Sequence, residues 1–137
     1  MQKNLFSFKG SLFAAFLLIP GFGEIAYAVD WNLKDRNGVQ YTLPALHGKW
    51  VQVNFWAPWC PSCLREMPDL DAMQQRHKDM QVIGVSVMYE SRQKVTDAIN
   101  KLSLSISCPI VFGNEDTAGD FGGLNGLPAA FCIRQPV

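Results

Sequence analysis

The sequence predicts an α/β fold in which strands and helices alternate along one domain, residues 29–137. Two apolar, β-branched runs, 50–56 and 82–88, predict strands. The stretch after each run carries apolar residues at helical spacing. Strand, helix, strand and helix in this order is the pattern of a βαβ unit with parallel strands. The chain has the length of a single domain.

The two predicted strands differ in their surroundings. In the first, Val51, Val53 and Phe55 alternate with Gln52 and Asn54, so one face is apolar and the other is partly polar. The run 82–88 is almost continuously apolar, as expected of a strand buried on both faces of a parallel sheet.

A pair of cysteines, Cys60 and Cys63, opens the first predicted helix. At this spacing the thiols lie on the same side of the first turn, close enough for a disulfide. Backbone N–H groups and the helix dipole stabilise a thiolate there, and such pairs have pKa values lowered into roughly the 3.5 to 7.5 range. We expect Cys60 to be the exposed attacking sulfur and Cys63 the buried partner. A structural disulfide or half a zinc site is the alternative, although a zinc site would want a second close pair.

The remaining elements are shorter. Strands over 31–33 and 39–42 flank a turn at 35–38, and 43–49 forms a loop. Ser91 caps the second helix, whose inner face carries Val95, Ala98, Ile99 and Leu102. An extended piece at 109–112, a helical turn at 116–121 and a glycine-rich loop lead to a last strand opened by Pro128.

The first 28 residues have the pattern of a secretory signal peptide. Lys3 and Lys9 precede an apolar stretch over 12–19, and Ala26-Tyr27-Ala28 supplies a cleavage signature. An uncleaved anchor is the alternative. Beyond residue 28 the chain carries 10 basic and 11 acidic side chains, so neither nucleic acid nor an anionic membrane surface is an expected partner. An exported chain meets an oxidising compartment in which disulfides persist.

Three segments carry a family resemblance: D-R-N-G-V-Q-Y-T-L-P-A-L-H-G-K-W, then V-N-F-W-A-P-W-C-P-S-C-L-R-E-M-P, then G-L-P-A-A-F-C-I. From Trp31 to Ile133 the chain resembles the TlpA-like thiol:disulfide oxidoreductases, the extracytoplasmic branch of the thioredoxin fold. The resemblance implies a central mixed sheet flanked by helices, with an N-terminal β-hairpin. Thioredoxin folds continue past the strand after Pro128, so it also implies that 29–137 is C-terminally truncated, lacking a strand and a helix.

The resemblance assigns further site residues. It implies a cis peptide bond before Pro128, packed against the cysteine pair, with Leu127 pairing to the substrate chain. Independently of the resemblance, Trp59 and Trp56 flank the cysteine motif and are expected to form an apolar rim around Cys60, although Trp56 fits the core equally well. Trp59 and Pro61 are the substrate-binding candidates of this rim. Thioredoxins carry a buried aspartate where this chain has Asn54, which cannot take a proton. Glu66, three residues after Cys63, is the candidate proton carrier, and a solvated surface glutamate is the alternative.

Four other residues with reactive side chains lie outside this motif. Cys108 and Cys132 are expected as two buried thiols, with Cys132 inside a core-strand pattern. A second disulfide between them is the alternative in an exported protein. His47 and His77 fit surface positions better than metal-ligand positions.

The sequence thus predicts a periplasmic, monomeric thiol:disulfide oxidoreductase with no cofactor beyond the Cys60–Cys63 disulfide. The resemblance favours a reductase of protein disulfides, serving cytochrome c maturation and recharged by a membrane thiol donor. A disulfide oxidase or isomerase is the first alternative, since the direction depends on relative thiolate stability. A Cu(I)-binding module and an inactive truncated relative are the others.

Overall fold

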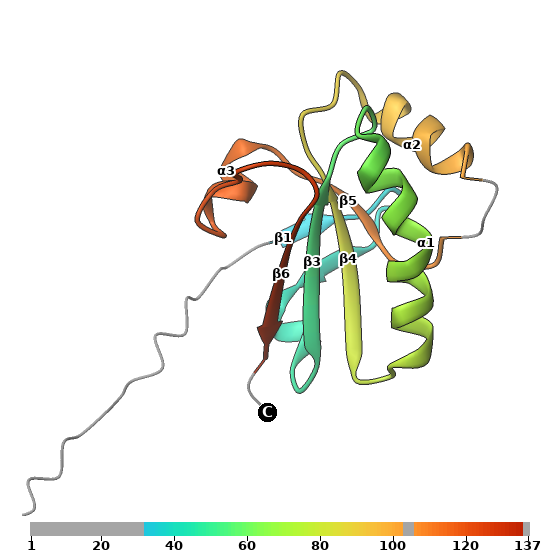
Figure 1. The fold of residues 1–137 in the computed structure, drawn as a ribbon. Helices are drawn as coiled ribbons and strands as arrows, with labels where there is room; N and C mark the ends of the chain where they lie inside the picture. Colours follow the sequence, from blue (N-terminus) through green and yellow to red (C-terminus); the bar gives the residue numbers. More distant parts are fainter. Residues whose placement is uncertain (1–31, 103–105, 136–137) are drawn as a thin grey trace, which may run out of the picture.

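A computed structural model describes residues 32–102 and 106–135 (Figure 1). The chain forms a two-stranded hairpin, a four-stranded sheet and helices on both faces of that sheet. The elements are β1 (Asn32–Lys34), β2 (Gln40–Thr42), the 3-10 helix η1 (Leu43–Leu46), β3 (Trp50–Trp56), α1 (Pro61–Arg76), β4 (Met80–Ser86), α2 (Arg92–Asn100), β5 (Ile110–Phe112), α3 (Glu115–Gly119) and β6 (Ala129–Arg134).

The central sheet is mixed, with strand order β5-β4-β3-β6. β3 pairs in parallel with β4 over its whole length, from Trp50 opposite Met80 to Trp56 opposite Ser86. β4 pairs in parallel with β5, and β6 runs antiparallel to β3 with Ala129 opposite Phe55. The α/β class, the parallel βαβ order and the N-terminal hairpin predicted from the sequence are confirmed.

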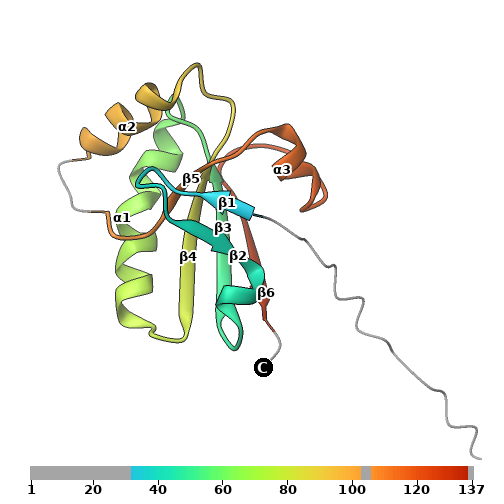
Figure 2. The ribbon, with the colours of Figure 1, turned by 180° about the vertical axis from the view of Figure 1, so that it is seen from behind.

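The sheet separates two buried cores. α1 and α2 cover one face, and the β1–β2 hairpin lies on the other (Figures 1 and 2). Trp56, Cys63 and Met67 belong to the first core, with Val95 and Ile99 of α2. The second core contains Val51, Val53, Phe55, Ile83, Val85 and Ala118 of α3. This division follows from the alternation along β3, since neighbouring side chains point to opposite faces.

Local signals place the helix starts. Cys60 is the N-cap of α1 and Pro61 its first residue, a position where the missing N–H is tolerated. α1 continues as one element through Pro68. Ser91 caps α2 as predicted, because its Oγ accepts a hydrogen bond from the Lys94 N–H at 3.3 Å.

A buried carboxylate ties α1 to the segment that enters β5. Asp71 Oδ1 accepts hydrogen bonds from the Ser107 N–H at 2.7 Å, the Ser107 hydroxyl at 2.7 Å and the Cys108 N–H at 2.8 Å. Asp71 Oδ2 accepts a fourth from the Gln75 amide at 2.7 Å. Asp71 therefore fixes the edge of the sheet next to β4.

Several boundaries differ from the sequence expectations. β4 begins and ends two residues before the predicted run 82–88, because its register with β3 starts at Met80. The predicted loop 43–49 contains η1. The expected signal peptide and Trp31 lie outside the described residues. Over the described ranges, β6 is the last element and no helix combines the length and apolarity needed to cross a bilayer.

Candidate active site

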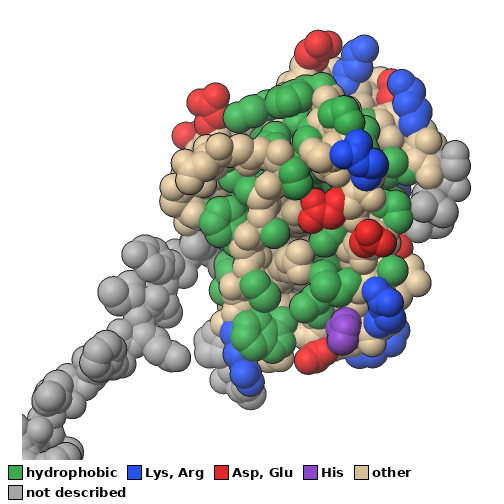
Figure 3. Space-filling model, in the orientation of Figure 1, with side chains coloured by type: hydrophobic (Ala, Val, Ile, Leu, Met, Phe, Trp, Pro, Cys, Tyr) green, Lys and Arg blue, Asp and Glu red, His purple; other side chains and the backbone are tan. Residues whose placement is uncertain are grey.

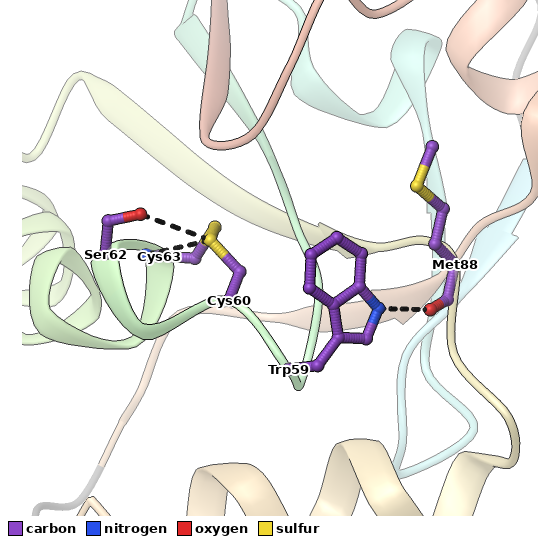
Figure 4. The surroundings of a disulfide bond; sticks show 5 residues. All are labelled: Trp59, Cys60, Ser62, Cys63 and Met88. Atoms are coloured by element: carbon purple, nitrogen blue, oxygen red, sulfur yellow. Dashed lines mark hydrogen bonds between the residues drawn. A yellow bond between two sulfur atoms is a disulfide. The ribbon is translucent and has the colours of Figure 1, made fainter.

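A disulfide joins Cys60 and Cys63 at the end of the sheet where β3 runs into α1 (Figure 4). The two sulfur atoms are 2.18 Å apart and the two Cα atoms 5.3 Å apart. Cys60 is the N-cap of α1 and Cys63 lies in its first turn. The disulfide predicted from the spacing is present in the structure.

The two cysteines have different surroundings. The Sγ of Cys60 accepts a hydrogen bond from the Cys63 N–H at 3.3 Å, and the Ser62 hydroxyl lies 3.3 Å away (Figure 4). Cys60 keeps 5% of its surface exposed and Cys63 none. The order of exposure agrees with the sequence expectation, but Cys60 is a buried residue rather than an exposed one. The expectation of an exposed Cys60 is wrong because Cys60 packs into the first core with Ala57 and Met67.

Trp59 forms an exposed rim beside the disulfide. It is 61% exposed, and its indole N–H donates a hydrogen bond to the Met88 carbonyl at 2.7 Å (Figure 4). Met88 is itself exposed and has a φ of +51°, a region that few residues other than glycine adopt. Trp56 belongs to the core, since it is completely buried. Of the two alternatives for Trp56, the core is correct.

The peptide bond between Leu127 and Pro128 is cis. Ala129 pairs with Phe55, so Pro128 lies beside the end of β3 from which the disulfide loop departs. Leu127 is half-buried and packs against the core that contains Cys60 and Cys63, whereas Pro128 and Pro61 are exposed. Pro128, Leu127, Trp59 and Pro61 thus surround the same end of the sheet.

Two grooves open at this end of the molecule. One, of about 440 Å³, lies along the loop before β6 and is lined by Phe121, Gly122, Gly123, Asn125, Gly126, Leu127, Pro128, Ala129 and Phe131. The other, of about 520 Å³, is lined by Pro58, Trp59, Leu64, Glu90, Lys94, Asp97, Ala98, Lys101 and Leu102. Figure 3 shows charged side chains mostly over the helices and hydrophobic ones on the strands beside α1.

Glu66 is half-buried on α1, three residues after Cys63. In the part of the chain that the structure describes, no hydrogen bond joins its carboxylate to either sulfur. Its role as the proton carrier therefore stays a prediction from the family resemblance.

Several buried polar side chains lie below α1 on the sheet. Asn54 and Ser86 are completely buried, and their side-chain polar atoms have no hydrogen-bond partner among the described residues. The indole Nε1 of the buried Trp56 is in the same situation. Sequence reasoning singled out Asn54 but missed Ser86, although a lone hydroxyl within the apolar run 82–88 was the available signal.

Cys108 and Cys132 are free thiols, not a disulfide. Cys108 lies beside β5 and Cys132 on β6, at opposite edges of a four-stranded sheet whose strands are about 4.8 Å apart. Burial, reinforced by the charge of Asp71, raises the pKa of Cys108 to about 12. Cys132 is exposed, so the expectation of a buried thiol is wrong for it. The reason is that β6 is an edge strand, where an alternating pattern leaves one face uncovered.

His47 and His77 are both exposed, as expected. Within residues 32–102 and 106–135, no group of three or more histidine, cysteine or acidic side chains is placed to hold a metal ion.

The fold, the disulfide at the start of α1 and the relatives described below place the chain in the class of thioredoxin-like thiol-disulfide oxidoreductases. Within that class the chain belongs to the AhpC/TSA family, whose model matches residues 26–136.

Two named relatives show the extent of the similarity. Thiol-disulfide oxidoreductase ResA of Oceanobacillus iheyensis is 30% identical over 97% of this chain and 78% of its own. ResA of Halalkalibacterium halodurans is 32% identical over 79% of this chain, which spans 61% of the length of that relative.

Solved structures agree on the fold. A thiol:disulfide interchange protein from Chlorobium tepidum superposes with a TM-score of 0.65 at 26% identity, covering 75% of this chain and 74% of its own. A secreted Mycobacterium tuberculosis disulfide oxidoreductase homologous to DsbE gives a TM-score of 0.65 at 18% identity, covering 77% of each chain.

Proposed function

We propose that this chain is an extracytoplasmic disulfide reductase that exchanges the Cys60–Cys63 disulfide with disulfides of protein substrates. The observation that carries the proposal is the position of this disulfide, at the N-terminus of α1 and beside the loop that holds Pro128. The relatives named ResA support exchange chemistry. The signal-peptide pattern in residues 1–28 supports export.

In the reducing direction the Cys60 thiolate attacks one sulfur of the substrate disulfide. A Cys60–substrate bond forms, and the other substrate sulfur leaves as a thiolate that takes up a proton. The Cys63 thiolate then attacks Cys60 Sγ, the Cys60–Cys63 bond forms, and the second substrate sulfur leaves and is protonated. Two electrons have moved to the substrate, and the chain ends in the oxidised state that the structure shows. Glu66 is the proposed proton carrier, and Leu127 and Pro128 are the proposed docking residues.

The contacts of Cys60 support the reducing direction. Its sulfur receives hydrogen-bonding contacts from a backbone N–H and from the Ser62 hydroxyl, both neutral groups. A cationic neighbour would stabilise the thiolate more strongly and would make the pair a better oxidant. In an oxidising compartment a reductase needs a dedicated electron donor, so we propose a membrane thiol-disulfide protein as partner and cytochrome c maturation as the setting.

Reduction of insulin by the purified chain, with dithiothreitol as electron source, tests exchange directly. The wild-type chain is expected to accelerate the reaction, Cys60→Ser to abolish it, and Cys132→Ser to leave it unchanged, because Cys132 lies outside the site. A wild-type rate equal to that of Cys60→Ser would overturn the proposed function. Efficient oxidation of reduced substrates with poor insulin reduction would instead assign the chain as an oxidase.

A further inference from the structure

One of the two grooves at the disulfide end of the sheet lies apart from the proposed docking residues. The groove along the loop before β6 contains Leu127 and Pro128. The second groove, of about 520 Å³, lies between the segment that leads into the disulfide and α2. α2 and the loop before β6 are on opposite sides of the β3–α1 connection (Figure 1). The second groove is therefore a separate surface beside the same disulfide.

This second groove, called the α2 groove below, has two walls. Pro58, Trp59 and Leu64 form the wall on the disulfide side, and Trp59 immediately precedes Cys60 in the chain. The 2.7 Å hydrogen bond from the Trp59 indole to the Met88 carbonyl fixes the position of this exposed ring (Figure 4). The opposite wall is formed by residues of α2 and its C-terminal end that recur three and four apart and so share one face: Lys94, Asp97, Ala98, Lys101 and Leu102.

The base of the α2 groove is apolar. Leu64 and Leu102 are half-buried and pack against the first core, to which the buried Ala98 also belongs. The volume of the groove lies within the range of roughly 300–1,000 Å³ that is usual for ligand pockets. A bulky aliphatic or aromatic side chain from another molecule thus fits between Trp59 and Leu102.

The rim of the α2 groove carries an excess of unpaired positive charge. Asp97 Oδ1 accepts a hydrogen bond from the Gln93 amide at 2.8 Å. Within the part of the chain that the structure describes, Lys94 and Lys101 form no ion pair, and neither does Glu90, the fourth charged residue of the rim. Two unpaired cations thus stand against one unpaired anion. At a rise of 1.5 Å per residue the two lysines are about 10 Å apart along the helix.

The α2 groove is continuous with the place where a substrate cysteine must bind. A cysteine bonded to Cys60 Sγ has its own chain on both sides, so the flanking residues extend over the surfaces next to Trp59. An extended segment advances about 3.3 Å per residue and turns every second side chain to the same side. An apolar side chain near the substrate cysteine therefore reaches the base of the groove, and an acidic one two residues further on reaches the lysines.

We propose that the α2 groove is a specificity site that binds the segment of a protein substrate beside its reactive cysteine. The segment has an apolar side chain that packs between Trp59 and Leu102, followed by a carboxylate that pairs with Lys94 or Lys101. This site rests on the reductase function proposed above and names its substrate class, an extended apolar and acidic segment. The exchange steps are unchanged, because the groove supplies only binding contacts.

Three symmetrical peptide disulfides test the specificity site. In the first, leucine stands two positions and glutamate four positions from the central cysteine on both sides. The second has lysine in place of glutamate, and the third has serine in place of leucine. The reduced chain transfers two electrons to each disulfide, giving two peptide thiols and the Cys60–Cys63 disulfide. The rate constant is divided by that for bis(2-hydroxyethyl) disulfide with the same variant, so that differences in thiol reactivity cancel.

The wild-type chain is expected to react about fivefold faster with the acidic peptide than with the basic one, because exposed ion pairs are individually weak. Replacing leucine by serine in the peptide is expected to lower the rate constant about fivefold, since less apolar surface is buried.

Two pairs of variants assign these preferences to the α2 groove. Lys94→Glu combined with Lys101→Glu is expected to reverse the charge preference. Lys34→Glu combined with Lys78→Glu changes the net charge equally at exposed sites outside the groove, and the wild-type preference is expected to stay within twofold. Leu102→Ala is expected to reduce the preference for leucine about threefold, whereas Leu33→Ala, on the hairpin at the other face of the sheet, is expected to retain it.

Equal rate constants for the three peptides with the wild-type chain would overturn the specificity site. An acidic preference that survives the charge reversal at Lys94 and Lys101, or that the reversal at Lys34 and Lys78 abolishes, would overturn it as well. If Leu102→Ala fails to fold, the charge reversals decide alone.

Failure of the reduced chain to reduce bis(2-hydroxyethyl) disulfide would contradict the proposed function and not the specificity site. In that case the oxidised chain is titrated with the same peptides carrying serine in place of cysteine, with tryptophan fluorescence as the readout. Tighter binding of the acidic peptide than of the basic one would support the site, and equal binding would overturn it.

Discussion

Replacing Asp71 by alanine tests how much one buried carboxylate contributes to holding β5 in the sheet. Three hydrogen bonds to Oδ1, from Ser107 and Cys108, would be lost together with the one from Gln75 to Oδ2. The Cys108 N–H is buried and would be left unpaired, at a cost of about 1–3 kcal/mol. Ser107 is exposed, so its N–H and hydroxyl would form hydrogen bonds with water instead. Their loss of Asp71 adds only about 0.5 kcal/mol to the cost.

The expected loss is thus about 2–3 kcal/mol in the free energy of unfolding, measured by urea denaturation with the disulfide intact. For a domain of this size that corresponds to a fall in Tm of about 10–20 °C. Asp71→Asn keeps an acceptor oxygen and is expected to lose about 1 kcal/mol. Asp69→Ala removes an exposed carboxylate from the same helix and is the matched control, with a change within about 0.5 kcal/mol. Equal effects of Asp71→Ala and Asp69→Ala would refute the assigned anchoring role.

Three further predictions concern the thiols and the rim. Iodoacetamide at mildly alkaline pH is expected to label Cys132 in the folded, oxidised chain, because Cys132 is exposed. Cys108 is expected to react only after denaturant is added. Labelling of both cysteines without denaturant would contradict the burial of Cys108. Because the pKa of Cys108 in the folded chain, about 12, exceeds its ordinary value of 9.0, the protonated thiol stabilises the fold fully below pH 9, and this contribution is lost as the pH rises through 12. Urea denaturation across this pH window is expected to show a smaller fall in the free energy of unfolding for Cys108→Ala than for the wild-type chain. Equal falls in the two chains would show that Cys108 does not cause the loss of stability. Trp59→Phe removes the hydrogen bond to the Met88 carbonyl. We expect it to lower kcat/KM for insulin reduction about fivefold, equivalent to about 1 kcal/mol. An unchanged kcat/KM would show that Trp59 is not part of the docking surface.

The elements with strong local signals were predictable from the sequence. Both ends of β3 match the predicted run 50–56, because a stretch of β-branched and aromatic residues that alternate with Gln52 and Asn54 ends just before Ala57 and Pro58. The Cys60–Cys63 disulfide and the Ser91 cap also depend on residues within one helical turn. Such features need no knowledge of the tertiary structure.

Features set by contacts distant in sequence were not predictable. The pattern of β6 resembles a core strand, but its edge position leaves Cys132 exposed. No local signal marks Asp71, because its partners Ser107 and Cys108 lie 36 and 37 residues away in the sequence. The buried, unpartnered hydroxyl of Ser86 could be recognised only once the β3–β4 register placed Ser86 opposite Trp56.

The equilibrium reduction potential of the Cys60–Cys63 pair tests the central claim most directly. The wild-type chain would be equilibrated in dithiothreitol and glutathione buffers, with Cys60→Ser as the control that cannot form the disulfide. Because both hydrogen-bond contacts of Cys60 are with neutral groups, we expect a potential near the thioredoxin value of about −270 mV, as a reductase requires. A potential near about −120 mV, the value of a strong disulfide oxidant, would contradict the assignment as a reductase.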